Sequence, residues 1–444
     1  MMAAGSEGSN VALNRRHRGD LLSDMLTRSR ARLLVTEDSA LNHLPDLQKC
    51  GIDYLMVVDH ENPTPVQNCT VLSFKDALLA EPSDGIPLLP SDPAAIIYTS
   101  GTTGRSKAVR LPHNAFCRGA ARFAEAYELR ESDVFHTWFP LYHVGGQLHA
   151  TMSMVLVGGS VGLVPTFSAS SFWGQVKRMR ATIFAGLGGM LTVLWKQESR
   201  TDDRESTLRI GLCGPSPVGI HRKFEQRFGV KILDQYGMSE AEFITLPDNS
   251  PVGSCGRPGP DYDVAIFDDH DHTLPAHQIG EIVCRPKAAD VIFQCYEDDD
   301  AATVQAWRNL WFHTGDLGYR DNDGFYYWVD RKSHAIRRRG ENVSSWELEQ
   351  IIQSHPLVAQ CAVVGIPSPL GEEDVKAVVV PTQGCGIDPR GLHAFCTEHM
   401  AHFMVPRYIE VRQALPLTSS EKVEKGKLRE NLGIVWDAEN QAPE

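Results

Sequence analysis

The sequence predicts an α/β fold: a large amino-terminal domain with doubly wound sheets and a β-rich subdomain, then a small α+β carboxyl-terminal domain. Three observations predict it. Strand patterns alternate with amphipathic helix patterns from the first residues, which favours a mostly parallel, doubly wound sheet. Beyond about residue 253 short strands and Gly/Asp turns take over, and from residue 344 the alternation returns. Because 444 residues exceed one typical domain, we expect domains at 1–330 and 331–444.

The first elements follow in order. Residues 20–26 show a helical pattern, and the apolar runs at 32–36 and 54–58 predict strands. The polar, proline-rich stretch at 81–93 is expected to be a linker. Four apolar residues and a tyrosine at 94–98 then predict a short buried strand.

The same rhythm continues through the middle of the chain. Residues 112–114 can cap a helix over 115–128. Two helix-then-strand pairs are predicted, at 171–179 with 181–185 and at 221–228 with 230–233. Residues 144–176 carry no Asp, Glu, Lys or Arg, but their glycines, serines and proline favour a buried α/β segment over a membrane span.

The second half begins with strands and ends with mixed structure. Residues 262–267 and 324–329 predict strands of the β-rich subdomain. Ser344 and Glu347 form a capping box that opens a helix to residue 354. Strands are then expected near 361–365 and 376–380.

Composition narrows the function classes. With 56 acidic against 43 basic residues and a net charge of −13, the chain offers no global field for nucleic acid, so an anionic ligand must be held locally. The ten cysteines are dispersed without zinc spacing, which indicates reduced thiols in a cytoplasmic protein. The first residues lack the apolar core of a signal peptide, and no integral membrane segment is expected.

The stretch after the strand at 94–98 has the composition of a phosphate-binding loop. Gly101 and Gly104 let backbone N–H groups close on an anion. Further donors come from Ser100, Thr102, Thr103 and Lys107. It is not a Walker A loop, because only two residues separate its glycines. The alternative is an ordinary Ser/Thr/Gly surface turn.

Three other clusters carry candidate chemistry, each with a plainer alternative. Tyr236-Gly-Met-Ser-Glu240 could hold Mg²⁺ against a phosphate, although one acidic residue after a turn is weak evidence. Trp311-Phe-His-Thr-Gly-Asp316 places a carboxylate on a turn, as a ribose diol requires, or is a plain Asp turn. Residues 329–343 concentrate cations, which are usually a solvated face. Near the end, residues 416–425 present Lys422.

In this order and at these separations, the clusters resemble the adenylate-forming superfamily of acyl-CoA synthetases, carrier-protein adenylation domains and luciferases. The likeness runs from about residue 11 to 430. The nearest likeness is to the carnitine or crotonobetaine CoA ligase-like branch, through Phe172-Trp-Gly-Gln-Val, Arg339-Gly-Glu-Asn-Val-Ser and Val405-Pro-Arg-Tyr-Ile-Glu. The resemblance implies a small mobile carboxyl-terminal domain and an ATP-dependent acid–CoA ligase that uses Mg²⁺. A small carboxylic acid, ATP and coenzyme A would be its partners.

The resemblance also implies a role for each matching residue. The loop formed by Thr99, Ser100, Gly101, Thr102, Thr103, Gly104 and Lys107 would grip the β- and γ-phosphates of ATP. Mg²⁺ would be held by Glu240 and Thr99, the α-phosphate by Ser239, the ribose by Asp316 and Arg331, and adenine by Tyr236 and Gly214. Lys422 would bridge the acid and the α-phosphate, Gly340 would line the coenzyme A tunnel, and His143 would gate the acyl site. A satisfied core histidine is the alternative for His143.

Some positions depart from the family pattern. Glu421 replaces the glycine that normally precedes the catalytic lysine, so Lys425 is kept as a substitute for Lys422. Ser333 stands at the position where many members carry a charged hinge residue. The acyl pocket is expected to be small and apolar, with no charged residue that identifies a substrate head group; it would be lined by 143–146, 185–190, 211–215 and Met238.

Two other function classes remain open at this point. A carrier-protein-loading adenylation enzyme would share the first half-reaction, although no carrier domain is attached here. A catalytically impaired ligand-binding homologue is suggested by Glu421 and by an amino terminus that looks truncated against the family pattern. Missing cover over the large domain would leave apolar surface bare, so a homo-oligomer is a further expectation.

Overall fold

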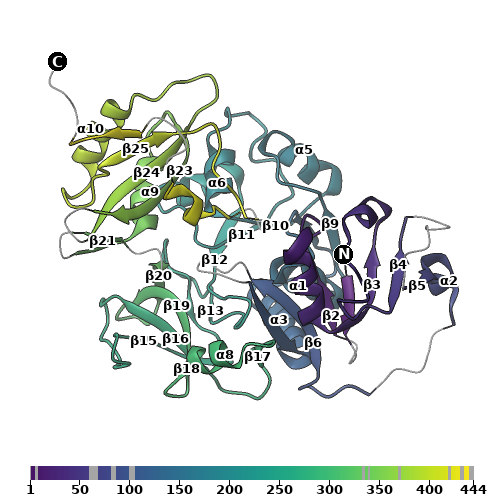
Figure 1. Cartoon of the computed structure of the whole chain (residues 1–444). Coiled ribbons are helices and arrows are strands. Elements are labelled where there is room, and N and C mark those ends of the chain that lie inside the picture. The colour runs from purple at the N-terminus through teal and green to yellow at the C-terminus, as the bar shows by residue number, and fades with distance from the viewer. Residues whose placement is uncertain are drawn as a thin grey trace.

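The computed structural model describes residues 2–5, 9–59, 69–81, 87–99, 106–332, 336–338, 341–368, 372–418, 422–430 and 435–439. The described residues form four main sheets (Figure 1). The amino-terminal strands lie at one end, the β-rich part and the carboxyl-terminal sheet lie at the other, and a parallel sheet lies between them.

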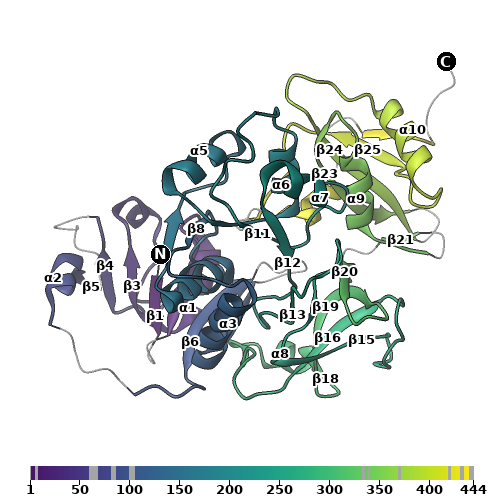
Figure 2. The same ribbon diagram turned by 180° about the vertical axis from the view of Figure 1, so that it is seen from behind.

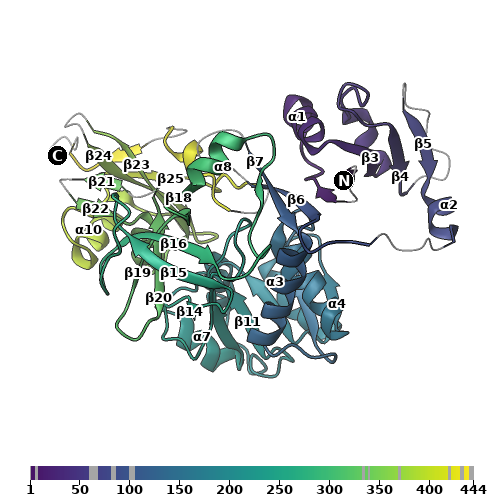
Figure 3. The same cartoon turned by 90° about the horizontal axis from the view of Figure 1, so that it is seen from below.

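The first sheet is eight-stranded and mixed. Its strands, in spatial order, are β17 (Cys295–Tyr296), β7 (Lys107–Pro112), β6 (Pro93–Thr99), β2 (Asn10–Ala12), β1 (Met2–Gly5), β3 (Ala31–Thr36), β4 (Tyr54–Val57) and β5 (Thr70–Ser73). Pairing is parallel for β2–β6, β3–β4 and β4–β5 and antiparallel for the rest. The expectation of a mostly parallel sheet is therefore wrong for this layer. Figure 3 shows β3, β4 and β5 extending to one side with helix α2 (Phe74–Leu79).

One apolar helix face fills the core beside this sheet. Helix α1 (Gly19–Ser29) buries Leu22, Met25 and Leu26, whose spacing of three and four residues places them on one face. They belong to one cluster with Leu34 and Leu55 from the neighbouring strands. A 3₁₀ helix (Asp38–His43) follows β3.

The second sheet is parallel throughout. Its order is β12 (Lys231–Asp234), β11 (Ile210–Cys213), β10 (Ile183–Gly186), β8 (Val134–Thr137) and β9 (Ser160–Leu163). Its helices are α3 (His113–Ala126), α4 (Ser153–Val157), α5 (Ala169–Met179), α6 (Gly188–Trp195) and α7 (His221–Phe228), with a π-helical segment at Gly145–Met152. In β10, Phe184 joins one core cluster while Ile183 and Ala185 join another, so both faces of the sheet are covered, as a doubly wound arrangement requires.

Two expectations from the sequence can be compared with the structure of this region. No helix in the described ranges is long and apolar enough to cross a membrane, and the uncharged stretch 144–176 is divided into short helices and a strand instead. The predicted side-chain cap of α3 is wrong. The helix begins at His113 without a side-chain cap, and the Asn114 side chain donates to the Ala289 carbonyl at 2.8 Å, so it holds a distant loop.

The β-rich part is antiparallel. Its sheet contains β15 (Tyr262–Phe267), β16 (Gly280–Pro286), β19 (Trp311–Arg320), β18 (Trp307–Arg308) and β20 (Tyr326–Arg331). A two-stranded pair, β13 (Thr245–Leu246) with β14 (Arg257–Pro258), and helix α8 (Asp300–Ala306) accompany it. Its buried residues share one cluster with Ile97 and Val109 of the first sheet, which fixes the two parts against each other.

The carboxyl-terminal part has its own sheet and core. A hairpin of β21 (Ile336–Arg338) and β22 (Glu341–Val343) precedes α9 (Ser345–Gln353). The sheet order is β23 (Val358–Pro367), β24 (Glu373–Pro381), β25 (Tyr408–Val411) and β26 (Val435–Asp437), with α10 (Pro389–His399) and a 3₁₀ turn at Lys425–Leu428. The Ser344 hydroxyl accepts from the Glu347 N–H at 3.2 Å, as the capping pattern predicts.

Candidate active site

Lys422 is carried on a short hairpin-like loop of the carboxyl-terminal part. Leu417 and Val423 form an isolated bridge, and the Lys422 N–H donates to the Thr418 hydroxyl at 3.1 Å. The residue remains open to solvent, yet protein atoms crowd its ammonium group, and this desolvation, with the nearby Arg331, lowers its pKa. Three carboxylates of the preceding part of the chain oppose that shift: Asp316, Glu242 and Glu240. The loop therefore delivers one cation into a group of acids that belong to other elements.

Lys425, the substitute considered for Lys422, is engaged elsewhere. Its ammonium lies 2.7 Å from Glu349 and donates to the Ser345 hydroxyl at 2.5 Å. Burial raises the pKa of Glu349, and the Lys425 charge opposes this rise. Lys425 thus ties the loop to helix α9, whereas Lys422 is the one that faces the acids of the other domain.

Asp316 lies in β19, where this strand pairs with β20. The two strands pair Asp316 with Arg331, whose Nε lies 3.5 Å from Asp316 Oδ1. The Tyr236 hydroxyl donates to Asp316 Oδ2 at 2.8 Å. Burial raises the pKa of Asp316, and Arg331 opposes this rise. Because a carboxylate has about four lone-pair sites, these two partners leave acceptor capacity for a diol.

Glu240 projects from a tight turn after β12. Met238 and Ala241 exchange backbone hydrogen bonds of 3.0 Å across this turn, which also contains the buried Ser239. The Tyr296 hydroxyl donates to Glu240 Oε1 at 2.9 Å, and burial raises the pKa of Glu240. The Lys107 ammonium lies 4.3 Å from the centroid of the Tyr296 ring. One tyrosine thus connects the candidate metal carboxylate to the candidate phosphate lysine.

The candidate phosphate loop joins two antiparallel strands. Thr99 ends β6 and Lys107 begins β7, where they form a cross-strand pair, and the Thr99 hydroxyl donates to the Lys107 carbonyl at 3.4 Å. Ser100, Gly101, Thr102, Thr103 and Gly104 lie outside the described residues. Strand β7 was not expected from the sequence, which suggested a helix soon after the loop. The Lys107 end of the loop nevertheless lies beside the Tyr296 ring, whose hydroxyl donates to Glu240.

The candidate adenine residues follow neighbouring parallel strands. Gly214 comes directly after β11, and Tyr236 comes two residues after β12, so both lie at the same edge of the sheet. A Cβ atom on Gly214 would lie 3.3 Å from the Gln235 carbonyl oxygen. Only a residue without a side chain fits comfortably there, and a flat ring could approach this backbone closely.

His143 lies just before the π-helical segment. The Gly145 N–H donates to His143 Nδ1 at 3.1 Å. Burial lowers the pKa of His143 to about 3, and the charges of Lys422 and His149 contribute to this shift. His143 is therefore neutral at physiological pH, with its proton on Nε2. It lies within electrostatic reach of Lys422, as a residue beside the acyl group should.

Two polar residues that the sequence did not single out lie in the same neighbourhood. The Nε2 atom of His149, in the π-helical segment, is 2.7 Å from Oε2 of Glu242. Glu242 follows Glu240 by two residues, and this proximity was the only available signal. Neither residue belongs to the expected lining of the acyl pocket.

The described residues offer carboxylates to Mg²⁺ but no complete protein cage for a metal ion. Within them, no group of three or more His, Cys, Asp or Glu side chains could form a complete metal cage. Mg²⁺ does not need one, because it keeps several waters and is often bound by one or two carboxylates together with substrate phosphates. Glu240 beside the phosphate-loop strands fits that pattern.

Comparison with known proteins gives the same assignment. A family described as AMP-binding enzyme matches residues 4–296, and its AMP-binding enzyme C-terminal domain matches residues 347–422. The chain belongs to the AMP-binding enzyme family. Among curated relatives, the crotonobetaine/carnitine–CoA ligase of Salmonella arizonae is 36% identical over 423 residues, which cover 91% of this chain and 80% of the relative. The enzyme of the same description from Citrobacter koseri is 36% identical over 410 residues, or 89% of this chain and 76% of that one.

Solved structures of AMP-binding enzymes share the fold. The anthranilate CoA ligase AuaEII in complex with anthranoyl-AMP gives a TM-score of 0.83 at 26% identity, over 94% of this chain and 81% of that one. ATP-bound MatB from Rhodopseudomonas palustris gives 0.81 at 26% identity, over 94% and 82%. The predicted α/β class and the predicted superfamily are thus confirmed.

Proposed function

We propose that this AMP-binding enzyme is an ATP-dependent acid–CoA ligase that activates a carboxylic acid as acyl-AMP and transfers it to coenzyme A. The observation that carries the proposal is that Lys422, from the carboxyl-terminal part, lies within electrostatic reach of Asp316, Arg331 and Glu240 of the preceding part. One cation that stands among acids from a second domain is placed to bind two anions at once, a carboxylate and a phosphate.

In the first half-reaction the acid carboxylate attacks the α-phosphorus of ATP, a new O–P bond forms, and the bond to pyrophosphate breaks. Catalysis of this kind consists mainly of positioning and charge neutralisation. Lys422 approaches both reacting groups, while Asp316 and Arg331 fix the ribose and Tyr236 with Gly214 flank adenine. Ser239 donates to the α-phosphate, and residues 99–107 grip the β- and γ-phosphates. Glu240 and Thr99 would hold Mg²⁺, which would neutralise phosphate charge when bound.

In the second half-reaction the thiol of coenzyme A attacks the acyl carbon and AMP leaves. We propose that the domain boundary lies near Arg331 and that the small domain turns about residues 331–333, which withdraws Lys422 and brings Gly340 to the coenzyme A tunnel. Ser333 and Gly340 lie outside the described residues.

Replacing Gly340 with leucine is expected to block thioester formation while leaving acyl-AMP formation unchanged, because the added side chain would fill space for the pantetheine arm. The measurement is pyrophosphate release and thioester formation in parallel, on the same preparation. Normal thioester turnover by the Gly340→Leu variant would show that Gly340 does not line the tunnel.

Lys196 connects the parallel-sheet region to the carboxyl-terminal part. It follows α6, and its ammonium donates to the Gln353 carbonyl at 3.3 Å and to the Val358 carbonyl, at the end of α9 and the start of β23. Figure 2 shows α6 beside α9 and β23. Because this arrangement also brings Lys422 to the acids, Lys196 should favour the conformation that makes acyl-AMP.

Lys196→Met keeps the aliphatic stem and removes the donors. We expect acyl-AMP formation to slow roughly fivefold, which corresponds to about 1 kcal/mol for the lost hydrogen bonds. Thioester formation from supplied acyl-AMP should not slow. Lys223→Met, at an exposed lysine of α7, is the matched control. Equal slowing of both half-reactions by Lys196→Met would contradict this role.

Two alternatives are decided by the acyl acceptor. A carrier-protein-loading enzyme would form acyl-AMP without releasing a thioester of free coenzyme A, and an impaired homologue would form neither product. Mass spectrometry after incubation with ATP, coenzyme A and an acid panel that includes crotonobetaine and carnitine, for which the curated relatives are named, separates the three cases. An acyl-CoA product supports the proposal, and acyl-AMP alone supports the carrier alternative.

We further propose a cytoplasmic enzyme that self-associates. The proposed cytoplasmic location is supported by the ten cysteines, which are all free. The proposed self-association is supported by apolar side chains that are exposed on and after α4, among them Val155, Leu156 and Leu163. Sedimentation velocity tests self-association, and a monomer at micromolar concentration would contradict it.

A further inference from the structure

The last residues of β20 contact the first residues of α9, so the β-rich part and the carboxyl-terminal part meet there (Figure 1). The Trp328 ring lies edge-on to the Trp346 ring, with centroids 6.0 Å apart. The Ser344 hydroxyl donates to the Val329 carbonyl at 2.9 Å. The chain therefore leaves β20 and returns to the same strand at the start of α9.

Asp330 is the charged residue of this contact. It is 1% exposed, and both of its carboxylate oxygens have donors. Oδ2 accepts from the Ser345 N–H at 2.6 Å and from the Ser345 hydroxyl at 2.7 Å, and Oδ1 accepts from the Arg331 N–H at 2.7 Å. Hydrogen bonds to a charged acceptor are roughly twice as strong as neutral ones, and a negative charge is favourable at a helix N-terminus. A buried carboxylate of one part thus holds a helix of the other.

Ser345 connects this carboxylate to the loop that carries Lys422. The Lys425 ammonium donates to the Ser345 hydroxyl at 2.5 Å and lies 2.7 Å from Glu349, further along α9. A hydroxyl can donate one hydrogen bond and accept two, so Ser345 can bind Asp330 and Lys425 together. Helix α9 and the Lys422 loop should therefore move as one unit.

Asp330 also lies next to the candidate ribose site. In the pairing of β19 with β20, Leu317 is opposite Asp330, and Asp316 is opposite Arg331. The start of α9 is therefore held directly beside the carboxylate that lies within electrostatic reach of Lys422. The accuracy of this contact matters, because a displacement of about 1 Å at a reacting group can cost about 10²-fold in rate.

We propose that Asp330 is a positioning residue for acyl-AMP formation, because its hydrogen bonds to Ser345 hold the carboxyl-terminal part where Lys422 reaches the acids. The inference rests on the proposed ligase function and on the proposed turn of the small domain about residues 331–333. Asp330 lies before those residues and Ser345 lies after them, so the turn must break the hydrogen bonds between the two. The contact thus favours the conformation of the first half-reaction, and losing it shifts the population away from that conformation.

Asp330→Asn tests the inference with little change in shape. The amide keeps one oxygen for the Arg331 N–H, but its NH₂ group cannot accept from Ser345. In single-turnover assays we expect acyl-AMP formation to slow about tenfold and thioester formation from supplied acyl-AMP to stay within about twofold of native. ATP affinity, measured by isothermal titration, should stay close to native, because Asp316 and Arg331 keep their pairing.

Ser345→Ala gives a second variant from the other side of the contact. It removes the hydroxyl and leaves the N–H, and Lys425 keeps its ion pair with Glu349, so acyl-AMP formation should slow by a smaller factor. The double variant should be no slower than Asp330→Asn alone, because both changes remove the same contact. Effects that multiply would show that the two residues act independently and would overturn the inference.

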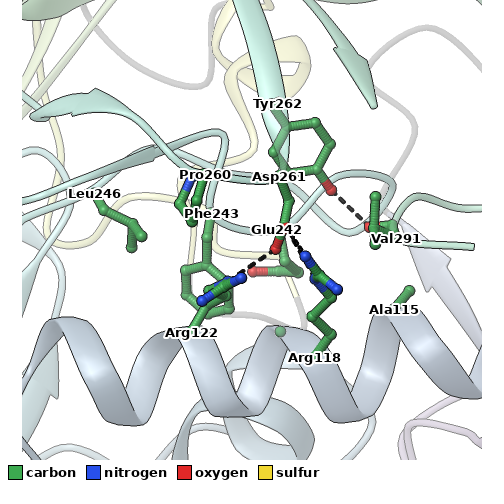
Figure 4. A pocket seen from close by; sticks show the side chains of 11 residues that line it. Ala115, Arg118, Arg122, Glu242, Phe243, Leu246, Pro260, Asp261, Tyr262 and Val291 are labelled. Atoms are coloured by element: carbon green, nitrogen blue, oxygen red, sulfur yellow. Dashed lines mark hydrogen bonds and ion pairs between the residues drawn. The ribbon is translucent and has the colours of Figure 1, made fainter. Parts of the chain in front are cut away.

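Asp261 provides a control for the loss of a buried carboxylate. It is 6% exposed and accepts from Arg118 at 2.8 Å and from Arg122 at 3.1 Å, both of which extend from α3 (Figure 4). Neither partner belongs to the carboxyl-terminal part, so Asp261→Asn should lower thermal stability without changing the ratio of the two half-reaction rates. If Asp330→Asn instead slows both half-reactions in proportion, it only supports the fold, and the inference is overturned.

Trypsin cleavage after the exposed Lys332, followed by mass spectrometry, tests the contact without ligase activity. Well below the unfolding temperature of every variant, Asp330→Asn should be cut several-fold faster than the native chain, and Asp261→Asn should not. Equal cleavage of the native and Asp330→Asn chains would overturn the inference. Native acyl-AMP formation by Asp330→Asn would also overturn it and leave the ligase function standing. A native chain that forms no acyl-AMP with any acid would remove the ligase function itself.

Discussion

Replacing Lys422 with alanine is expected to slow acyl-AMP formation about 10²- to 10³-fold, the usual effect of removing one preorganised charge from a transition state. The variant loses the cation that faces Asp316, Glu240 and Glu242, so the carboxylate and the α-phosphate would approach without neutralisation. Thioester formation from supplied acyl-AMP should remain close to native, because the proposed domain rotation would withdraw Lys422 in that step. Single-turnover assays of the two half-reactions measure both effects.

The neighbouring lysines provide controls for Lys422. Lys427→Ala removes an exposed cation that pairs with Glu424 and should change neither half-reaction. Lys425→Ala removes the partner of Glu349, so it should lower thermal stability more than it lowers the rate of adenylation in the folded enzyme. A Lys425→Ala variant with the larger adenylation defect, at native stability, would transfer the catalytic role to Lys425.

The second large effect is expected at Asp316. Asp316→Ala should weaken ATP binding by at least about 2 kcal/mol, or roughly 30-fold in Kd, because it removes the proposed ribose acceptor and leaves Arg331 and the Tyr236 hydroxyl without their partner. Isothermal titration with ATP measures the loss. Asp300→Ala, at an exposed aspartate of α8, is the control.

Deoxynucleotides give the sharper test of that role. The native enzyme should bind 3′-deoxy-ATP more weakly than ATP, because one hydroxyl of the diol is missing. The Asp316→Ala variant should bind the two nucleotides equally. If the variant still distinguishes them, another group reads the ribose, and Asp316 serves to orient Tyr236 and Arg331.

Regular structure was predictable where a pattern repeats along the chain. The strands β3 and β4 and the helices α1, α5 and α7 fall within a few residues of their expected positions, because apolar periodicity and burial act locally. The Ser344 hydroxyl also caps helix α9, as the sequence predicts. These signals depend on neighbours within a few residues, so tertiary structure did not override them.

The features that the sequence did not predict have a common physical reason. The mixed pairing of the first sheet depends on partners far along the chain, as in the pairing of β7 with β17. Asn114 is a good capping residue by type, but a distant carbonyl competes for its side chain. The Glu242–His149 contact joins residues 93 positions apart, and no local pattern could reveal it. The sequence revealed the candidate site as separate motifs. Only the folded structure shows that these motifs lie near one another.

Acid-dependent exchange of labelled pyrophosphate into ATP tests the central claim most directly, because exchange requires reversible formation of acyl-AMP. The native chain, supplied with ATP, Mg²⁺ and a panel of carboxylic acids, should catalyse exchange with at least one acid, and the Lys422→Ala variant should lose it. Subsequent addition of coenzyme A to the native enzyme should convert that acid into its thioester. Absence of exchange with every acid, from a preparation that is folded and binds ATP, would contradict the account and leave a nucleotide-binding protein without ligase chemistry.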